Sequence, residues 1–116
     1  MLKDQYKMQA KVWLYPGTLR HSSGKAGCWH FVTLPKKQSV KIKKRFRAMA
    51  KGWGSLPVMA AIGKTIWETS LFPDRKAAAY LLPVKADVRK KENITEGDII
   101  AVSLKIRTYH GAKESK

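Results

Sequence analysis

Residues 56–72 read LPVMAAIGKTIWETSLF, and they predict a β-hairpin. Two short, largely apolar runs, residues 56–62 and 66–72, contain the β-branched and aromatic residues that favour strands. Gly63 and Lys64 lie between the runs, where a tight turn is needed. This hairpin makes a β-rich fold the first expectation.

Before the hairpin, residues 36–51 predict a helix. Ile42, Phe46 and Met49 lie at positions i, i+4 and i+7, so they form one apolar stripe on a helix. Val40 falls off that stripe and has no assigned partner. The helix is expected to end at the Gly-Trp-Gly-Ser sequence of residues 52–55.

The remaining elements are short. Residues 6–14 alternate between apolar and polar types, which is typical of a strand with one buried face. Further strands are predicted at residues 28–34, 78–82 and 99–106, a short helix at 83–91, and turns at 73–76 and 95–98. Six strands with two short capping helices predict an all-β fold, a closed six-stranded small barrel or double-split pseudobarrel.

An internal echo supports this arrangement. Val32-Thr33-Leu34-Pro35 aligns with Tyr80-Leu81-Leu82-Pro83, 48 residues further on, and each segment precedes a basic helix. Within those helices the same offset aligns Val40-Lys41 with Val88-Arg89. Either a duplication or chance similarity between two strand-to-helix junctions explains the match. A duplication predicts a pseudo-twofold barrel with a helix at each end.

The chain of 116 residues has room for a single domain, 1–116. Its core is expected at about residues 6–106, with a frayed tail at 108–116. The lone Cys28 cannot form an internal disulfide, so we expect a cytoplasmic protein. No stretch is apolar over the length that a membrane span requires, so no membrane partner is expected.

Charge is the strongest compositional signal. The chain has 24 Lys and Arg against 8 Asp and Glu, a formal net charge of +16. Residues 5–67 contain 13 of those cations and no carboxylate. Because internal ion pairs cannot neutralise this half, repulsion among its cations should destabilise it unless a polyanion binds. Nucleic acid is the expected polyanion, and a basic surface that serves solubility alone is the alternative.

The predicted helix 36–51 concentrates these cations, which surround its apolar stripe. A phosphate backbone would relieve the repulsion between them, whereas the alternative is a solvated helix face. Trp53 follows between two glycines, where it would stack on a base or plug the barrel. The expected nucleic-acid-binding residues are Lys36, Lys37, Lys41, Lys43, Lys44, Arg45, Arg47, Lys51, Trp53 and Arg89.

No catalytic site, metal site or cofactor is expected. His21, His30 and His110 lack metal-ligand spacing, and Cys28 with His30 supplies only two ligands. The chain also lacks a glycine-rich phosphate loop.

Several motifs in order resemble a small prokaryotic family of unknown function, whose members occur alone or fused to a bacteriocin-protection domain. The likeness covers roughly residues 6–106. It rests on GCWHFVTLP at 27–35, Ile62-Gly63, WETSLFP at 67–73, YLLPVK at 80–85, Val88-Arg89-Lys90 and Gly97-Asp98. This resemblance implies a closed six-stranded barrel with helical caps, and it assigns no activity.

The C-terminal half has a weaker likeness. Residues 80–91, YLLPVKADVRKK, followed by ITEGD at 94–98, are similar to the AbrB-like swapped-hairpin transcription factors, which pair two such halves to grip DNA. Arg89 matches the basic helix position of that pattern; as a lone arginine it is otherwise a surface residue or a partner for Asp87 or Glu92. The first half departs from the pattern, because Gly54-Ser55 stands where the second half has Gly97-Asp98.

The sequence therefore predicts a non-enzymatic module that contacts the phosphates of DNA or RNA. The main alternative is a small-ligand or enzymatic barrel linked to stress or bacteriocin resistance, with Trp53, Trp67 and Tyr80 lining a pocket. A third hypothesis is that the protein is a module that binds an acidic protein. Pocket depth and the continuity of the positive face discriminate between these functions.

Overall fold

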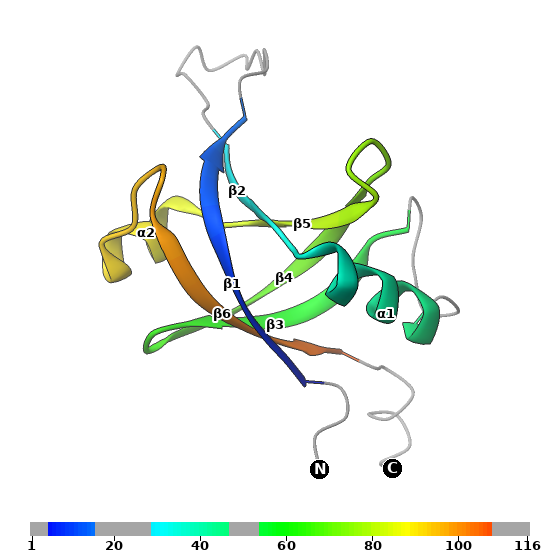
Figure 1. The fold of residues 1–116 in the computed structure, drawn as a ribbon. Helices are drawn as coiled ribbons and strands as arrows, with labels where there is room; N and C mark the ends of the chain where they lie inside the picture. The colour runs from blue at the N-terminus through cyan, green and yellow to red at the C-terminus, as the bar shows by residue number, and fades with distance from the viewer. Residues whose placement is uncertain (1–4, 16–28, 47–53, 108–116) are drawn as a thin grey trace, which may run out of the picture.

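The computed structural model describes residues 5–15, 29–46 and 54–107. It confirms a closed antiparallel barrel of six strands, in the order β1-β2-β5-β4-β3-β6, with two helices (Figure 1). The elements are β1 Gln5–Leu14, β2 His30–Thr33, α1 Lys36–Phe46, β3 Leu56–Ile62, β4 Thr65–Asp74, β5 Ala79–Pro83, α2 Ala86–Glu92 and β6 Ile99–Ile106.

The predicted hairpin forms as β3 and β4, which pair from Leu56 with Leu71 to Ile62 with Thr65. Alternate residues of β3 point inward, so Val58 and Ala60 are fully buried. Gly63 has a φ of +61°, a left-handed conformation that glycine adopts without strain. The tight turn between the strands therefore depends on this residue.

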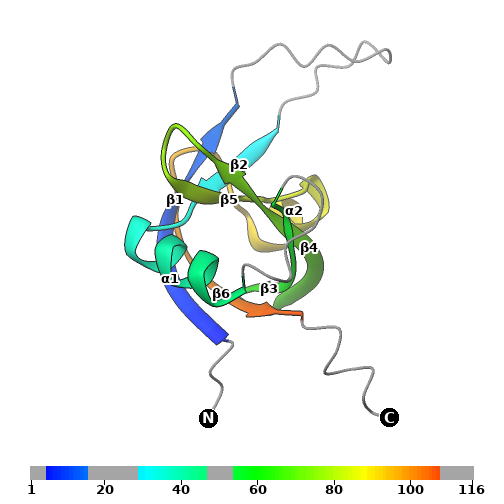
Figure 2. The same ribbon diagram turned by 90° about the vertical axis from the view of Figure 1, so that its right-hand side faces the viewer.

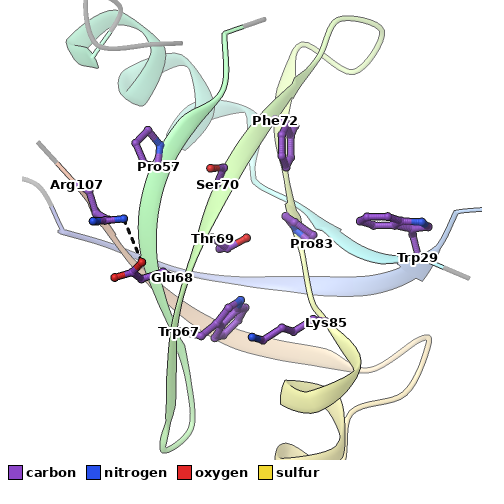
Figure 3. Close-up of a pocket in the computed structure, with 10 residues that line it drawn as sticks. All are labelled: Trp29, Pro57, Trp67, Glu68, Thr69, Ser70, Phe72, Pro83, Lys85 and Arg107. Carbon is purple, nitrogen blue, oxygen red and sulfur yellow. Dashed lines mark hydrogen bonds and ion pairs between the residues drawn. The ribbon is translucent and has the colours of Figure 1, made fainter. Parts of the chain in front are cut away.

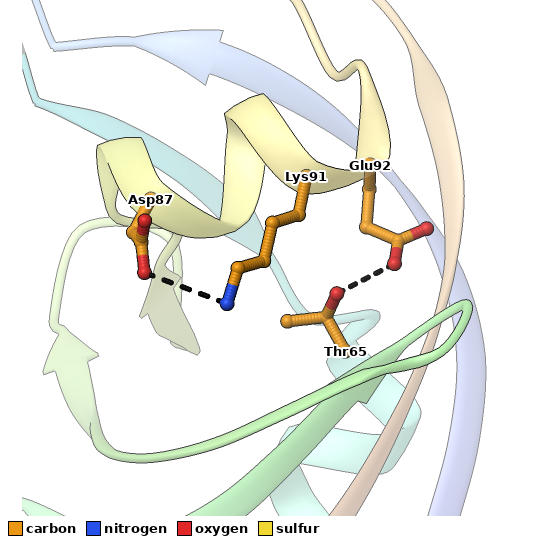
Figure 4. Close-up of polar contacts among 4 residues, drawn as sticks. All are labelled: Thr65, Asp87, Lys91 and Glu92. Atoms are coloured by element: carbon orange, nitrogen blue, oxygen red, sulfur yellow. Dashed lines mark hydrogen bonds and ion pairs between the residues drawn. The ribbon is translucent and has the colours of Figure 1, made fainter.

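The turn of this hairpin is held by α2 (Figure 4). Glu92 Oε2 accepts hydrogen bonds from Thr65 Oγ1 at 2.6 Å and from the backbone N–H of Lys64 at 3.2 Å. A Cβ added to Gly63 would collide with this carboxylate. Gly63 thus provides both the turn conformation and the space in which Glu92 joins α2 to the hairpin.

The barrel has a pseudo-twofold arrangement. Exchanging β1, β2 and β3 with β4, β5 and β6 leaves every neighbour in the closed strand order unchanged. In the β2–β5 pair Thr33 opposes Leu81, and in the β3–β6 pair Val58 opposes Ile106. The two residues in each of these two pairs are 48 positions apart in the sequence. The offset of the sequence echo is therefore repeated in the pairing of the strands.

The echo fails in the helices. Val40 is 53 % exposed, whereas Val88 is 1 % exposed and packs in the core. Helix α1 instead buries Ser39, Ile42 and Phe46. The reason is that the two helices begin at different distances from the echoed prolines: α1 starts one residue after Pro35, whereas α2 starts three residues after Pro83.

Side chains fill the inside of the barrel. Fully buried residues come from every strand, among them Val12, Val32, Leu56, Leu71, Leu82 and Leu104. The alternation predicted for β1 is confirmed, since Ala10 and Val12 are buried while Tyr6 and Met8 pack partly against the same core. The two helices lie on opposite sides of the barrel in both views (Figures 1 and 2).

Two predicted boundaries were wrong. Pro73 and Asp74 belong to β4, and the turn occupies residues 75–78. Asp74 still shapes it, because its Oδ1 accepts hydrogen bonds from the N–H groups of Lys76 at 3.1 Å and Ala77 at 3.5 Å. Pro83 lies in β5, where it opposes Phe31, and α2 begins at Ala86 rather than at Pro83.

Some sequence expectations fall outside the described residues. They concern Cys28, the end of the predicted helix 36–51 with Arg47, Met49 and Lys51, the residue Trp53, and the tail 108–116. Among the described residues, no helix combines the length and apolar character needed to cross a membrane.

Candidate functional site

Helix α1 separates its residues into a buried stripe and a cationic side. Ser39, Ile42 and Phe46 are buried at spacings of three and four, so they lie on one face of the helix. All six cations of the helix are exposed: Lys36, Lys37, Lys41, Lys43, Lys44 and Arg45. The helix therefore presents its positive charge to solvent while its apolar stripe holds it against the barrel.

Polar contacts fix α1 on the barrel wall. The backbone N–H of Tyr80 on β5 donates to Ser39 Oγ at 3.0 Å, inside the protein. Gln38 Nε2 donates to the carbonyl oxygen of Lys7 on β1 at 3.3 Å. These contacts hold the helix against β5 on one side and near β1 on the other.

The cations of α1 extend onto neighbouring elements. Lys7 is exposed on β1 beside Gln38, and Arg75, in the turn after β4, lines the same groove as Lys43. We call these eight residues the α1 cationic surface: Lys7, Lys36, Lys37, Lys41, Lys43, Lys44, Arg45 and Arg75.

No carboxylate of the described residues pairs with a lysine of α1. Within the described residues, Lys36, Lys37, Lys41, Lys43 and Lys44 form no ion pair; the pairs found there join Asp87 to Lys91 and Glu68 to Arg107. Asp74 is the acid that lines the groove beside α1, and its Oδ1 accepts backbone hydrogen bonds. The five lysines of α1 thus have no carboxylate partner in the part of the chain that the structure describes.

The groove beside α1 has a volume of about 590 Å³. Val40 and Lys43 of the helix form one wall, and Asp74, Arg75 and Tyr80 belong to the strands and turn opposite. Burial raises the pKa of the Tyr80 phenol above its ordinary value, so this side chain is neutral at physiological pH. The charged side chains that line the groove are therefore Lys43, Arg75 and Asp74.

Helix α2 carries a second, smaller group of cations. Arg89 Nε donates to the carbonyl oxygen of Val84 at 3.1 Å, which fixes its side chain over the start of the helix. Lys91 pairs with Asp87 at 3.8 Å (Figure 4). Because α2 lies across the barrel from α1, Arg89 does not join the α1 cationic surface (Figures 1 and 2).

The structure thus brings together six of the ten residues that the sequence singled out, all on α1. Arg47, Lys51 and Trp53 lie outside the described residues. The pocket expected for the alternative function is not formed by its two described members, because Trp67 and Tyr80 line different grooves. Among the described residues, no group of three or more His, Cys, Asp or Glu is placed to hold a metal ion.

Sequence reasoning missed an aromatic face on the outside of the barrel, formed by Trp13 and Tyr15 with Trp29 and Phe31. The rings of Trp13 and Phe31 are 5.4 Å apart, and those of Trp29 and Phe31 are stacked at 6.0 Å. The sequence did contain a signal for this face. Trp13 is two residues from Tyr15, and Trp29 is two residues from Phe31, a spacing that places both side chains of each pair on one face of a strand. Strand pairing, which sequence alone does not give, joins the two pairs.

A shallow groove of about 480 Å³ begins beside Trp29 (Figure 3). Its lining includes Phe72, Pro83 and Lys85, and the deeper-lying Trp67 is buried. Glu68 and Arg107 form an ion pair at 3.4 Å on the side of the groove that faces β3 and β6. The groove therefore combines aromatic surface with hydroxyl, ammonium and paired charged groups.

A search of curated proteins finds no significant match to the chain. A family model described as a domain of unknown function, DUF1905, matches residues 9–104. The match begins within β1 and ends within β6, so it includes all or part of every strand of the barrel. The chain belongs to the DUF1905 family.

Proposed function

We propose that this protein is a cytoplasmic nucleic-acid-binding module, without catalytic activity of its own, that holds a phosphate backbone on the α1 cationic surface. The observation that carries the proposal is the exposed side of α1, on which five lysines have no carboxylate partner among the described residues. Lys37 and Lys41, and Lys41 and Arg45, are four residues apart. Like charges at this spacing destabilise a helix by about 0.2–0.5 kcal/mol per pair.

A polyanion is the ligand that removes this repulsion. Each Lys or Arg that neutralises a phosphate also releases condensed counterions, which supplies most of the free energy of non-specific binding. Lysine contacts phosphate as a mobile point charge, and five of the six cations on α1 are lysines. We therefore expect contacts to the backbone, with little readout of the bases.

The filled barrel disfavours the alternative function. Its interior is occupied by core side chains such as Val58, Leu82 and Leu104, so a small ligand would have to bind in one of the open grooves outside. Small-molecule sites usually enclose most of their ligand. An enzymatic or ligand-binding barrel is therefore not our proposal.

Purification from cells tests the proposal without choosing a ligand in advance. At low salt, we expect the protein to carry material that absorbs at 260 nm, and a salt gradient should remove it as phosphate contacts are screened. Nuclease treatment of the low-salt sample is the control and should remove the same absorbance. A spectrum of protein alone at every salt concentration would contradict the proposal.

A further inference from the structure

The aromatic face is rigidly built. Trp13 Nε1 donates to Thr33 Oγ1 at 2.9 Å, which fixes the indole against β2. The backbone N–H of Tyr15 donates to the carbonyl oxygen of Trp29 at 2.8 Å, so these two residues oppose each other across the strands. The rings of Tyr15 and Phe31 meet edge to face at 6.2 Å. The four rings therefore form one ordered surface rather than separate side chains.

Much of this surface remains in contact with solvent. Trp29 is 45 % exposed and Tyr15 is 42 % exposed, so a binding partner could bury both side chains further. Clustered exposed apolar side chains on a monomer mark a binding surface more often than scattered ones do. Trp29 and Tyr15 thus leave part of their side-chain surface open to a ligand.

Two cations line the grooves beside Trp29. Trp29 shares the groove of Figure 3 with Lys85, and it shares a second groove, of about 240 Å³, with Lys85 and Arg89. Arg89 is held in place by its hydrogen bond to Val84. The carboxylate in the first groove, Glu68, is paired with Arg107. A ligand on Trp29 would therefore lie in grooves that Lys85 and Arg89 also line.

We infer that the aromatic face stacks the bases of single-stranded nucleic acid while Lys85 and Arg89 hold its phosphates. This inference rests on the proposed function and names its substrate class. Planar rings with anionic links match an aromatic surface flanked by cations, whereas a neutral apolar partner would have to desolvate Lys85 and Arg89. A duplex does not fit, because its bases already stack on one another and their faces are covered.

The test compares a single-stranded oligonucleotide with the duplex of the same sequence, by fluorescence anisotropy. We expect Trp29→Ala to weaken single-strand binding about 5- to 150-fold, the range for one stacked base, and to leave duplex binding unchanged. Trp29→Phe, which keeps an aromatic ring, should retain most of the affinity. Ile99→Ala is the matched control, because Ile99 is a large apolar residue that is 67 % exposed on β6.

The outcomes separate the inference from the proposed function. Equal affinity of the wild type and Trp29→Ala for the single strand, or equal loss for both oligonucleotides, would overturn the stacking role and leave the phosphate contacts of α1 standing. A wild type that binds neither oligonucleotide would overturn the proposed function. Dimerisation of the wild type that Trp29→Ala abolishes would assign the aromatic face to a second copy of the chain and overturn the inference. Thermal unfolding of each variant confirms that the fold is intact.

Discussion

Replacing Lys41, Lys44 and Arg45 together by glutamate is expected to abolish nucleic-acid binding. All three side chains are exposed on α1, so the change reverses the charge at the centre of the α1 cationic surface. Three phosphate contacts are lost, and three carboxylates then repel the backbone that the remaining lysines attract. We expect the affinity to fall by about 100-fold or more at low salt, measured by fluorescence anisotropy.

A second triple variant separates local charge from net charge. Lys11→Glu, Lys64→Glu and Lys90→Glu changes three exposed lysines on β1, the β3–β4 turn and α2. Both variants lower the formal charge of +16 by six units. The control should lose much less affinity than the α1 variant, since charges spread over the surface act only through the general field. Equal losses would contradict the assignment to α1.

Shortening Ile42 to alanine is expected to cost about 2–5 kcal/mol of the free energy of unfolding. Ile42 has no exposed surface and anchors α1 in the core, so the truncation removes apolar contacts and leaves a cavity. Urea unfolding followed by circular dichroism measures the change. The same experiment reports whether α1 is part of the cooperative unit of the barrel.

Val40→Ala on the same helix is the matched control. Val40 is 53 % exposed, so its truncation should change the free energy of unfolding by no more than about 0.5 kcal/mol. A cost for Val40→Ala that equals the cost for Ile42→Ala would show that the buried stripe of α1 had been assigned to the wrong residues.

The fold was largely predictable from local pattern. The 56–72 hairpin, the alternation in β1 and the Ile42–Phe46 stripe each depend on the spacing of a few apolar residues, and each is confirmed. Closure into a barrel also followed, because six short strands would otherwise leave exposed edges. Where local signals competed, prediction failed: Pro73 and Pro83 favour turns by themselves, but pairing with Tyr80 and Phe31 keeps them in strands.

The candidate surfaces were predictable only in part. The cations of α1 are adjacent in sequence, so the helical pattern placed them together. The aromatic face required knowing that Trp13 opposes Phe31, and the groove beside Trp29 required the neighbouring position of β5. These juxtapositions come from strand register between distant segments, which neither composition nor periodicity contains.

The dependence of affinity on salt measures the central claim, that lysine–phosphate contacts on α1 drive binding. If the six cations of α1 each neutralise one phosphate of a DNA duplex, the plot of log affinity against log salt concentration should have a slope of about −5. The variant with glutamate at positions 41, 44 and 45 should show a slope closer to zero wherever its binding can be measured. An affinity of the wild type that stays constant from low to high salt would contradict the account.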